Sequence, residues 1–347
     1  MKALQYVTVG QPPEVREVPT PQPGPGEVRL RVTAAGACHS DSFVMGLNEE
    51  QYSAFGYPLP MTLGHEGVGV VDALGEGATG IELGEAVAVY GPQGCGRCRT
   101  CAQGIENYCP HAASRGIHPP GLGKDGAMAE YMIVEDPRLL IPLGDLDPAE
   151  SVALTDAGLT PYHSIAGSLD LLVPGSTAVV IGVGGLGHMA IQLLRTLTSA
   201  TVIALDISES KLDFAREVGA HYAFLSDDDA AQHIAEAVGP EPVTAVFDFV
   251  TNEPVLKIAF SVSGPLTDLV LIGAGSVDTA VGLLGQPYGS RIRAPYWGSR
   301  PELMEVLELA RTGQISVDTE HFTLDQAPEA YRKLHEGELR GRAVIVP

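Results

Sequence analysis

The sequence predicts an α/β protein with two parts, a β-rich N-terminal part and a doubly wound parallel sheet. Three observations predict it. Short strands between glycine-rich turns fill the first 150 residues, apolar strands alternate with amphipathic helices after that, and a glycine-rich turn joins one of these strands to a helix. The length of 347 residues also exceeds what one hydrophobic core comfortably accommodates.

The N-terminal part is predicted to be a small barrel or sandwich, because its strands are short and glycine-rich turns separate them. In the first strand, apolar residues alternate with Arg29, Arg31 and Thr33, which is the pattern of a half-buried strand. The proline-rich stretch 19–26 before it is expected to be an extended connector. The strands are expected at 28–34, 68–74, 86–90 and 131–134.

Near residue 150 the pattern changes to buried strands that alternate with helices. Continuous apolar strands are typical of a parallel sheet that is covered on both faces. Strands are expected at 176–181, 201–205, 244–249 and 269–273, and helices at 148–164, 186–194 and 211–218. After about residue 288 we expect one more helix, with Leu303 and Val306 facing inward, and a last strand at 343–346.

The composition argues against nucleic-acid and membrane partners. Acidic residues outnumber basic ones by 43 to 21, and the net charge is -22. Such a surface repels polyanions. No apolar run reaches the roughly 18 residues of a membrane span, and the first residues are too polar for a signal sequence. A cytoplasmic protein is therefore expected. The acidic run 227–229 is interpreted as the start of a helix.

Four of the five cysteines are clustered with the spacing C-x2-C-x2-C-x7-C, at Cys95, Cys98, Cys101 and Cys109. Four thiolates at this spacing can bind one structural zinc ion tetrahedrally. Disulfides are disfavoured by the odd number of cysteines and by the expected reducing compartment. An iron–sulfur cluster is a minor alternative. A structural zinc lobe is therefore predicted at 91–112.

The fifth cysteine, Cys38, has two candidate partners, His65 in Gly-His-Glu and Asp156 in Leu-Thr-Asp. Thiolate, imidazole and carboxylate are all zinc ligands, and three protein ligands leave a position for water or substrate, as in a catalytic site. A second zinc is therefore expected here. A small core residue is the alternative for Cys38 considered alone.

The glycine-rich turn has the spacing G-x-G-x-x-G between an apolar strand and a helix. Gly182 would make the tight turn, Gly184 would let the backbone approach a pyrophosphate, and Gly187 would let the helix lie close to the strand. Asp206 ends the next strand, where a carboxylate can accept hydrogen bonds from the adenosine ribose and repel the 2′-phosphate of NADP. NAD is therefore predicted over NADP. Lys211 would flank the adenine, and a helix cap is the alternative for Asp206.

Together, the segments Ala-Cys38-His39-Ser40-Asp41 and Gly64-His65-Glu66-Gly67, the four-cysteine lobe and the glycine turn resemble the zinc-dependent medium-chain alcohol dehydrogenases. The resemblance covers essentially the whole chain. The most similar group is the bacterial NAD-dependent secondary alcohol dehydrogenases, which share the segment around Trp297.

The resemblance implies a domain organisation. A chaperonin-10-like β-barrel catalytic domain would span 1–153, a Rossmann NAD-binding domain 154–288, and a C-terminal part 289–347 that completes the catalytic domain. It also implies a homodimer, with a tetramer as the alternative.

The resemblance further implies the roles of residues in an alcohol–ketone interconversion with two zinc ions per chain. Cys38, His65 and Asp156 would bind the catalytic zinc. Ser40 would take the alcohol proton, and His39 would contact the cofactor pyrophosphate, move protons, or both. The implied cofactor contacts are His39, Ser40, Thr160, Gly182, Val183, Gly184, Gly185, Leu186, Gly187, Asp206, Lys211, Phe249, Gly273 and Arg342. Two roles have alternatives: Glu66 would approach the metal or pair with a buried arginine, and Arg342 would contact a phosphate or be solvated.

The chain departs from the family pattern at Phe43, where many relatives have a histidine at the outlet for the proton. Phenylalanine cannot carry a proton, so we interpret it as part of an apolar substrate pocket. The other pocket residues would be Phe55, Tyr57, Leu122 and Trp297, and a core role is the alternative for the aromatic ones.

Oxidation of hydrophobic secondary and some primary alcohols is predicted, and a polyol, threonine or an aldehyde adduct is the alternative substrate. A zinc-free quinone reductase is an alternative with the same fold, but the presence of Cys38, His65 and the cysteine lobe argues against it. A non-enzymatic zinc module that binds nucleic acid or protein is disfavoured by the acidity and by the glycine turn.

Overall fold

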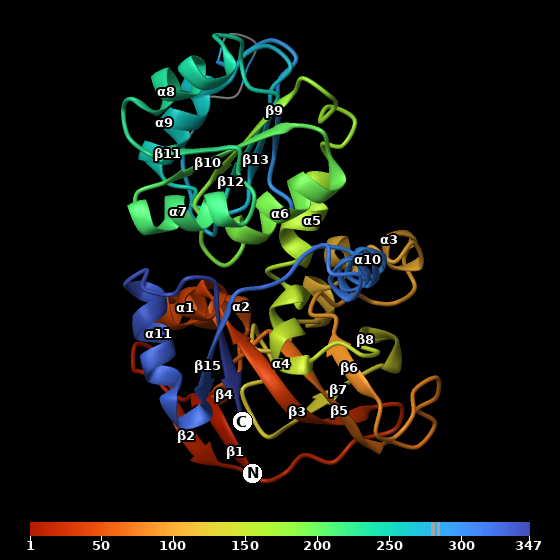
Figure 1. The fold of residues 1–347 in the computed structure, drawn as a ribbon. Helices are drawn as coiled ribbons and strands as arrows, with labels where there is room; N and C mark the ends of the chain where they lie inside the picture. The colour runs from red at the N-terminus through yellow and green to blue at the C-terminus, as the bar shows by residue number, and fades with distance from the viewer. Residues whose placement is uncertain (279–281, 283–284) are drawn as a thin grey trace. The chain divides into compact units, whose positions relative to one another are not determined.

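The computed structural model describes residues 1–278, 282 and 285–347 (Figure 1). Contacts divide the chain into two compact units. The first contains Met1–Leu159, Ser299–Gly313 and Val317–Pro347, and the second contains Thr160–Gly298 and Gln314–Ser316. The division at residues 160 and 298 lies later in the chain than the predicted 154 and 288.

A seven-stranded sheet is the core of the first unit, in the order β15-β16-β3-β5-β6-β8, with β7 paired to β3. The two long strands, β3 (Val28–Ala37) and β5 (Glu66–Leu74), are antiparallel neighbours. The other strands are β6 (Ala86–Val89), β7 (Tyr131–Val134), β8 (Leu140–Pro142), β15 (Thr319–Thr323) and β16 (Arg342–Val346). A second, three-stranded sheet contains β1 (Lys2–Tyr6), β2 (Glu14–Glu17) and β4 (Met61–Thr62).

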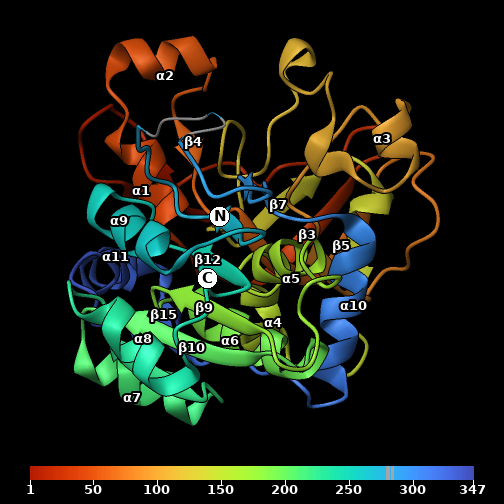
Figure 2. The same ribbon diagram turned by 90° about the horizontal axis from the view of Figure 1, so that it is seen from above.

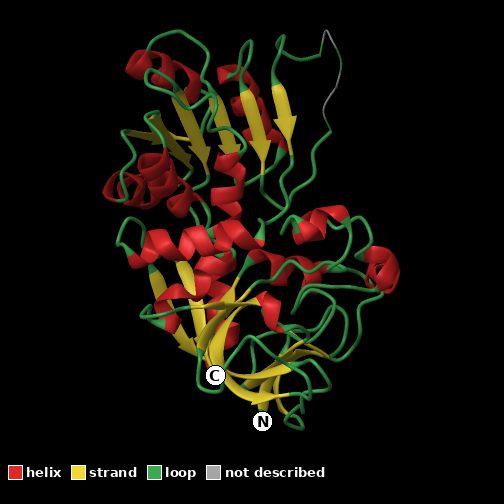
Figure 3. Ribbon diagram, turned by 90° about the vertical axis from the view of Figure 1, so that its right-hand side faces the viewer, coloured by secondary structure: helices red, strands yellow, loops and turns green. Residues whose placement is uncertain are grey.

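The helices of the first unit are short and lie around this sheet (Figure 3). Figure 2 shows α10 beside α3, where the Arg300 N–H donates to the Gly104 carbonyl. The helices are α1 (His39–Gly46), α2 (Glu49–Phe55), α3 (Arg99–Ala102), α4 (Pro148–Ser151), α10 (Arg300–Arg311) and α11 (Ala327–His335).

The second unit contains the predicted parallel sheet, in the order β11-β10-β9-β12-β13-β14. The buried residues of β9, β10 and β12 form its core with those of α9. The strands are β9 (Thr177–Ile181), β10 (Thr201–Asp206), β11 (Tyr222–Leu225), β12 (Ala245–Asp248), β13 (Asp268–Leu271) and β14 (Arg291–Arg293), and the helices are α5 (Leu159–Ala166), α6 (Gly187–Leu197), α7 (Glu209–Glu217), α8 (Ala230–Val238) and α9 (Glu253–Val262). The predicted fold class is thereby confirmed.

The predicted elements are incomplete, and some of their details are wrong. The helix expected at 148–164 is interrupted, because Asp156 leaves helical geometry with φ -133 and ψ -59 between a 3₁₀ turn and α5. A second helix, α11, follows α10. The edge strands β11 and β14 were missed; they are short, and most of their residues are exposed or half-buried. As predicted, α8 begins directly after the acidic run 227–229.

None of the helices in residues 1–278, 282 and 285–347 is both long and apolar enough to cross a membrane.

Candidate active site

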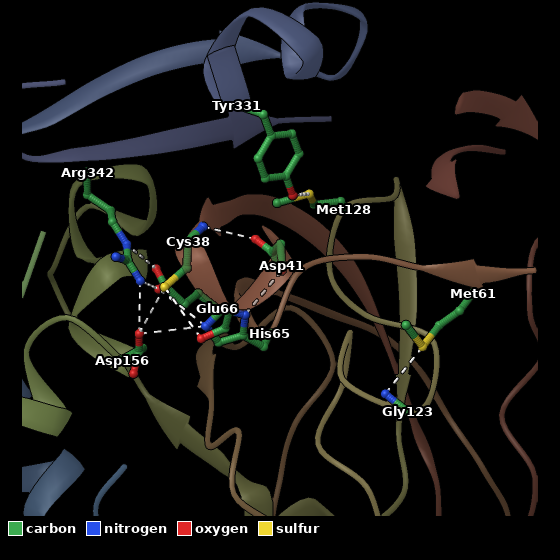
Figure 4. A network of polar contacts seen from close by, with 11 residues as sticks. Cys38, Asp41, Met61, His65, Glu66, Gly123, Met128, Asp156, Tyr331 and Arg342 are labelled. Atoms are coloured by element: carbon green, nitrogen blue, oxygen red, sulfur yellow. Dashed lines mark hydrogen bonds and ion pairs between the residues drawn. The ribbon is translucent and has the colours of Figure 1, made fainter. Parts of the chain in front are cut away.

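The register of the central sheet brings distant segments together. Gly36 near the end of β3 pairs with Glu66, the first residue of β5. Ala37 pairs on its other side with Ala343, the second residue of β16. Cys38, which follows β3, therefore lies close to His65, which precedes β5, and to Arg342 at the start of β16 (Figure 4). Asp156 joins them because the chain breaks out of helical geometry at this residue.

The predicted catalytic ligands lie within metal-binding distance of one another. The donor atoms of Cys38, His65, Glu66 and Asp156 all lie within 4.8 Å of each other, and all four residues are buried. Asp156 Oδ2 lies 3.7 Å from Cys38 Sγ and 3.6 Å from His65 Nε2. Donors around a tetrahedral zinc at bonds of about 2.0–2.3 Å are ~3.3–3.8 Å apart. The thiolate, imidazole and carboxylate present therefore fit zinc.

Asp41 is a site residue that the sequence analysis missed. Its side chain is fully buried, and its carboxylate accepts the Cys38 N–H at 2.9 Å and lies 3.3 Å from His65 Nδ1. Because a carboxylate only accepts, Nδ1 carries the proton and Nε2 is directed at the other predicted ligands, which is the arrangement of metal-bound histidines. One sequence signal could have indicated Asp41: it stands three residues after Cys38, the N-cap of α1, which is the spacing of a capping box.

A buried ion-pair network adjoins the ligands. Arg342 is 2% exposed, and its guanidinium donates to Glu66 and to Asp156 Oδ2 at 2.9 Å. The interpretation of Arg342 as a solvated charge is therefore wrong, and Glu66 has the buried arginine partner that was its alternative role. A Cβ on Gly36 would lie 1.8 Å from Glu66 Oε2, so the glycine makes room for this carboxylate.

The network also sets the ionisation of the ligands. Burial disfavours the Cys38 thiolate, but the Arg342 charge and the His65 hydrogen bond outweigh it, so the pKa of Cys38 is lowered. Burial by itself would lower the pKa of His65, yet hydrogen bonds to Asp156, Asp41 and Cys38 raise it well above its ordinary value. The thiolate form that a metal requires is therefore favoured at Cys38.

The four clustered cysteines also converge on one point. Cys98 Sγ lies 3.4 Å from Cys101 Sγ and 3.9 Å from Cys109 Sγ, and Cys95 Sγ lies 4.0 Å from Cys101 Sγ. All are free thiols, so the disulfide alternative is wrong. A hydrogen bond from Thr100 is the main cause that lowers the pKa of Cys98 to about 6. The spacing fits a tetrahedral zinc, whose sulfur atoms are ~3.8 Å apart at bonds of about 2.3 Å.

In the second unit, the glycine turn has the geometry of a nucleotide-binding turn. Gly182 has φ 91, and a Cβ on Gly187 would lie 1.8 Å from the Gly182 carbonyl oxygen. A Cβ on Gly184 would meet no atom within 4 Å, so protein packing does not require a glycine there, whereas a close pyrophosphate would. The residues present therefore fit a dinucleotide.

The other predicted cofactor residues of the second unit lie in the turn, beside it or elsewhere in this unit, whereas His39, Ser40 and Arg342 belong to the first unit. The Asp206 carboxylate accepts the Val183 N–H at 2.7 Å and the Ser208 N–H at 3.0 Å, which fixes it beside the turn. Phe249 and Gly273 follow the neighbouring strands β12 and β13. Gly185 and Leu186 complete the turn. Lys211 lies on α7. Thr160, the first residue of the unit, is buried.

Comparisons with known proteins agree with both units. Residues 24–145 match the model of the alcohol dehydrogenase GroES-like domain, and residues 185–311 match that of the zinc-binding dehydrogenases. An NAD-dependent alcohol dehydrogenase of Sulfurisphaera tokodaii is 32% identical, with 100% of both chains covered. The chain belongs to the zinc-binding alcohol dehydrogenase family.

Further members of this family vary in substrate and cofactor. A D-arabinose 1-dehydrogenase (NADP(+)) of Saccharolobus solfataricus is 30% identical and covers 100% of this chain and 97% of its own. Among solved structures, the alcohol dehydrogenase of Aeropyrum pernix has a TM-score of 0.91 at 30% identity, with 100% of both chains covered. The acetophenone reductase of Geotrichum candidum, in complex with NAD, has a TM-score of 0.85 at 29% identity and covers 100% of this chain and 97% of its own.

Three of the predicted pocket residues of this alcohol dehydrogenase form a ring cluster. The rings of Phe43 and Phe55 are 6.3 Å apart, and those of Phe55 and Tyr57 are 5.3 Å apart. Phe43 is 46% and Phe55 47% exposed, so a core role is wrong for both. Leu122 is half-buried in the same unit. Trp297 belongs to the second unit and is buried.

Ser40 and His39, the residues predicted to relay the proton, lie in the first turn of α1. Ser40 Oγ is 3.7 Å from Cys38 Sγ. The ring of His39 is 6.4 Å from that of His335. Desolvation, and then the charges of Arg342 and His335, lower the pKa of His39, so its neutral form is favoured.

The buried pair Arg342–Glu66 predicts a stability effect. Arg342→Met would leave the Glu66 carboxylate buried without its partner and is expected to lower the free energy of unfolding by about 3–5 kcal/mol. Denaturant unfolding measures it. The double variant Glu66→Gln/Arg342→Met removes both charges and should recover most of the loss. Equal instability of the single and double variants would contradict the assigned pairing.

The Asp206 carboxylate predicts the cofactor preference. Asp206→Asn removes the negative charge at constant shape, so the ratio of kcat/KM for NAD over NADP should fall about 10-fold, which corresponds to about 1.4 kcal/mol. Steady-state kinetics with both cofactors measure it. Asp213→Asn removes a charge that is 73% exposed on the neighbouring helix α7 and serves as the matched control. A wild-type enzyme that uses both cofactors equally would show that Asp206 does not select.

Proposed function

We propose that this alcohol dehydrogenase interconverts hydrophobic secondary alcohols, and some primary ones, with their ketones and aldehydes, using NAD and a catalytic zinc. The observation that carries the proposal is the convergence of Cys38, His65 and Asp156 at the spacing of tetrahedral zinc ligands. The structural zinc would be held by Cys95, Cys98, Cys101 and Cys109.

The chemistry divides between the bound groups and the chain. Zinc supplies a Lewis acid that lowers the pKa of an alcohol, and NAD supplies the hydride acceptor. Cys38, His65 and Asp156 hold the metal. The Ser40 hydroxyl, 3.7 Å from Cys38 Sγ, would relay the alcohol proton: it would accept that proton and give its own to the nicotinamide ribose of bound NAD. Two further residues fix the ligands: Asp41 keeps the proton on His65 Nδ1, and Arg342 neutralises carboxylate charge beside the site.

The preference for NAD is supported by Asp206. Its carboxylate is fixed beside the glycine turn by two backbone N–H groups, where it would accept hydrogen bonds from the ribose hydroxyls. A 2′-phosphate would place negative charge next to it. The next residue, Ile207, is apolar and 84% exposed, so it offers no positive charge to a phosphate.

The preference for apolar substrates is supported by the ring cluster. Phe43 is three residues after Ser40 on α1, so both lie on the same side of this helix. The exposed ring faces of Phe43 and Phe55 offer apolar surface and no hydrogen-bond partners for the several hydroxyl groups of a polyol. A hydrophobic alcohol is therefore the better fit.

We also propose that the enzyme is a cytoplasmic homodimer. A reducing compartment suits five free cysteines. The proposal of a dimer is based on the resemblance to the family. Light scattering, which measures the mass in solution, would test it.

Oxidation of an alcohol panel tests the proposed activity. With NAD, larger secondary alcohols should be oxidised with a higher kcat/KM than ethanol, sorbitol, threonine or D-arabinose. Cys38→Ser should abolish the activity and reduce the metal content from two zinc ions per chain to one, because only the catalytic site loses a ligand. Activity that persists in Cys38→Ser would refute the catalytic metal site.

The ring cluster predicts a change in substrate preference. Phe55→Ala removes part of the apolar surface and should raise KM for large secondary alcohols about 5-fold, or ~1 kcal/mol. The KM for ethanol should not change, because ethanol is too small to need this surface. Equal changes for both substrates would argue against a pocket role for Phe55.

A further inference from the structure

His188 is a buried histidine of the second unit that the proposed mechanism does not use. It is the second residue of α6, directly after the last glycine of the turn, and its side chain is fully buried. Its ring stacks on that of Phe214 in α7, with the centroids 5.4 Å apart and an angle of 27° between the planes. The packing therefore fixes the ring and directs its nitrogen atoms at fixed points.

One of these nitrogen atoms contacts the glycine turn. His188 Nδ1 lies 2.9 Å from the Gly184 carbonyl oxygen, and because a carbonyl only accepts, Nδ1 carries the proton and donates it. The backbone N–H of His188 donates to the same oxygen at 3.2 Å. His188 thus supplies two donors to this carbonyl, one from its side chain and one from the start of the helix.

The peptide unit between Gly184 and Gly185 is one that needs such a restraint. Its plane rotates about ψ of Gly184 and φ of Gly185, and neither residue has a Cβ that would hinder the rotation. Gly184 is exposed, and a Cβ on it would meet no atom within 4 Å, so side-chain packing does not hold the plane either. Of the contacts at this peptide, those from His188 are therefore the ones that set its orientation.

The orientation of this peptide decides what the turn presents to a ligand. In a trans peptide the C=O and the N–H point in opposite directions. With the Gly184 carbonyl held toward His188, the Gly185 N–H points away from α6, the side on which the N-terminus of a helix binds phosphate groups. A flipped peptide would present a carbonyl oxygen there, which repels phosphate oxygens.

We infer that His188 is a positioning residue for the cofactor, which holds the Gly184–Gly185 peptide so that its N–H faces the pyrophosphate of NAD. The inference deepens the proposed function, since it assumes that the dinucleotide binds at the glycine turn. Without the Nδ1 donor, only the longer backbone bond would hold the carbonyl, and the flipped peptide would become populated. The loss of one hydrogen bond of ordinary strength corresponds to about a 5-fold loss of affinity.

The test is a titration of the purified enzyme with NADH, in which the cofactor fluorescence gives Kd without turnover. His188→Leu keeps an apolar side chain of similar size against Phe214 but removes the donor, so it should raise Kd about 5-fold. His188→Asn carries an amide nitrogen at the position of Nδ1, so its Kd should stay within about 2-fold of the wild-type value. His188→Met takes the place of the leucine variant if that one does not fold, because its unbranched side chain adapts to the site.

Thermal unfolding separates positioning from packing. Asparagine is smaller than histidine and would leave a cavity beside Phe214, so His188→Asn should have a lower Tm than His188→Leu. If His188 had only a structural role, the less stable asparagine variant would also be the weaker binder of NADH. The inference predicts the opposite order, in which the more stable leucine variant binds NADH more weakly.

His233→Leu is the matched control in the same unit. The ring of His233, on α8, lies 5.6 Å from that of Phe224, with an angle of 33° between the planes. Its buried Nδ1 has no hydrogen-bond partner among residues 1–278, 282 and 285–347. The variant therefore removes a histidine ring from an aromatic neighbour without removing a contact to the glycine turn, and it should leave Kd for NADH unchanged.

The outcomes separate the inference from the proposed function. A wild-type enzyme that does not bind NADH overturns the proposed cofactor site, and the inference falls with it. Wild-type affinity in His188→Leu overturns the inference alone, and so does an affinity of His188→Asn as low as that of His188→Leu. An equal rise of Kd in His188→Leu and His233→Leu shows general loosening of the unit and also overturns the inference.

Discussion

The buried guanidinium of Arg342 is the interaction on which the candidate site depends. Two carboxylates, Glu66 and Asp156, lie within its reach in a region closed to water. Buried carboxylates are costly unless they are paired and hydrogen-bonded. One arginine at the start of β16 therefore makes it feasible to concentrate a thiol, an imidazole and two acids where β3 ends, β5 begins and the chain breaks before α5. The C-terminal strand is as much a part of the site as the segments that supply the ligands.

The parts of the fold that follow from local patterns were predictable. β9, the glycine turn and α6 follow one another with a clear change from a buried strand to a helical period, and their ends lie within three residues of the predicted ones. The helix expected at 148–164 failed for a physical reason. Its apolar spacing continues through Asp156, but the backbone turns aside there to direct a carboxylate into the site. A functional requirement overrode the local preference.

The two cysteine sites also differ in how far the sequence could predict them. The lobe is visible in the sequence because its four thiols lie within one short stretch. The other predicted ligands come from positions 38, 65 and 156. The pairing of β3 with β5 brings Cys38 and His65 together, and the break in the helix before α5 adds Asp156. The resemblance to a known family could suggest that these three residues act together, whereas their spacing in the sequence could not. Asp41 escaped notice because its contact with His65 joins two segments that the sequence does not place side by side.

One consequence concerns the space that Gly36 leaves open. The carboxylate of Glu66 fills the volume that a methyl group at position 36 would need, so the two residues share a single compartment and cannot be altered separately. An alanine at 36 is compatible only with a shorter side chain at 66, and a shorter side chain at 66 leaves a hole unless 36 grows. A substitution at position 36, whether designed or evolved, therefore requires a matching substitution at position 66.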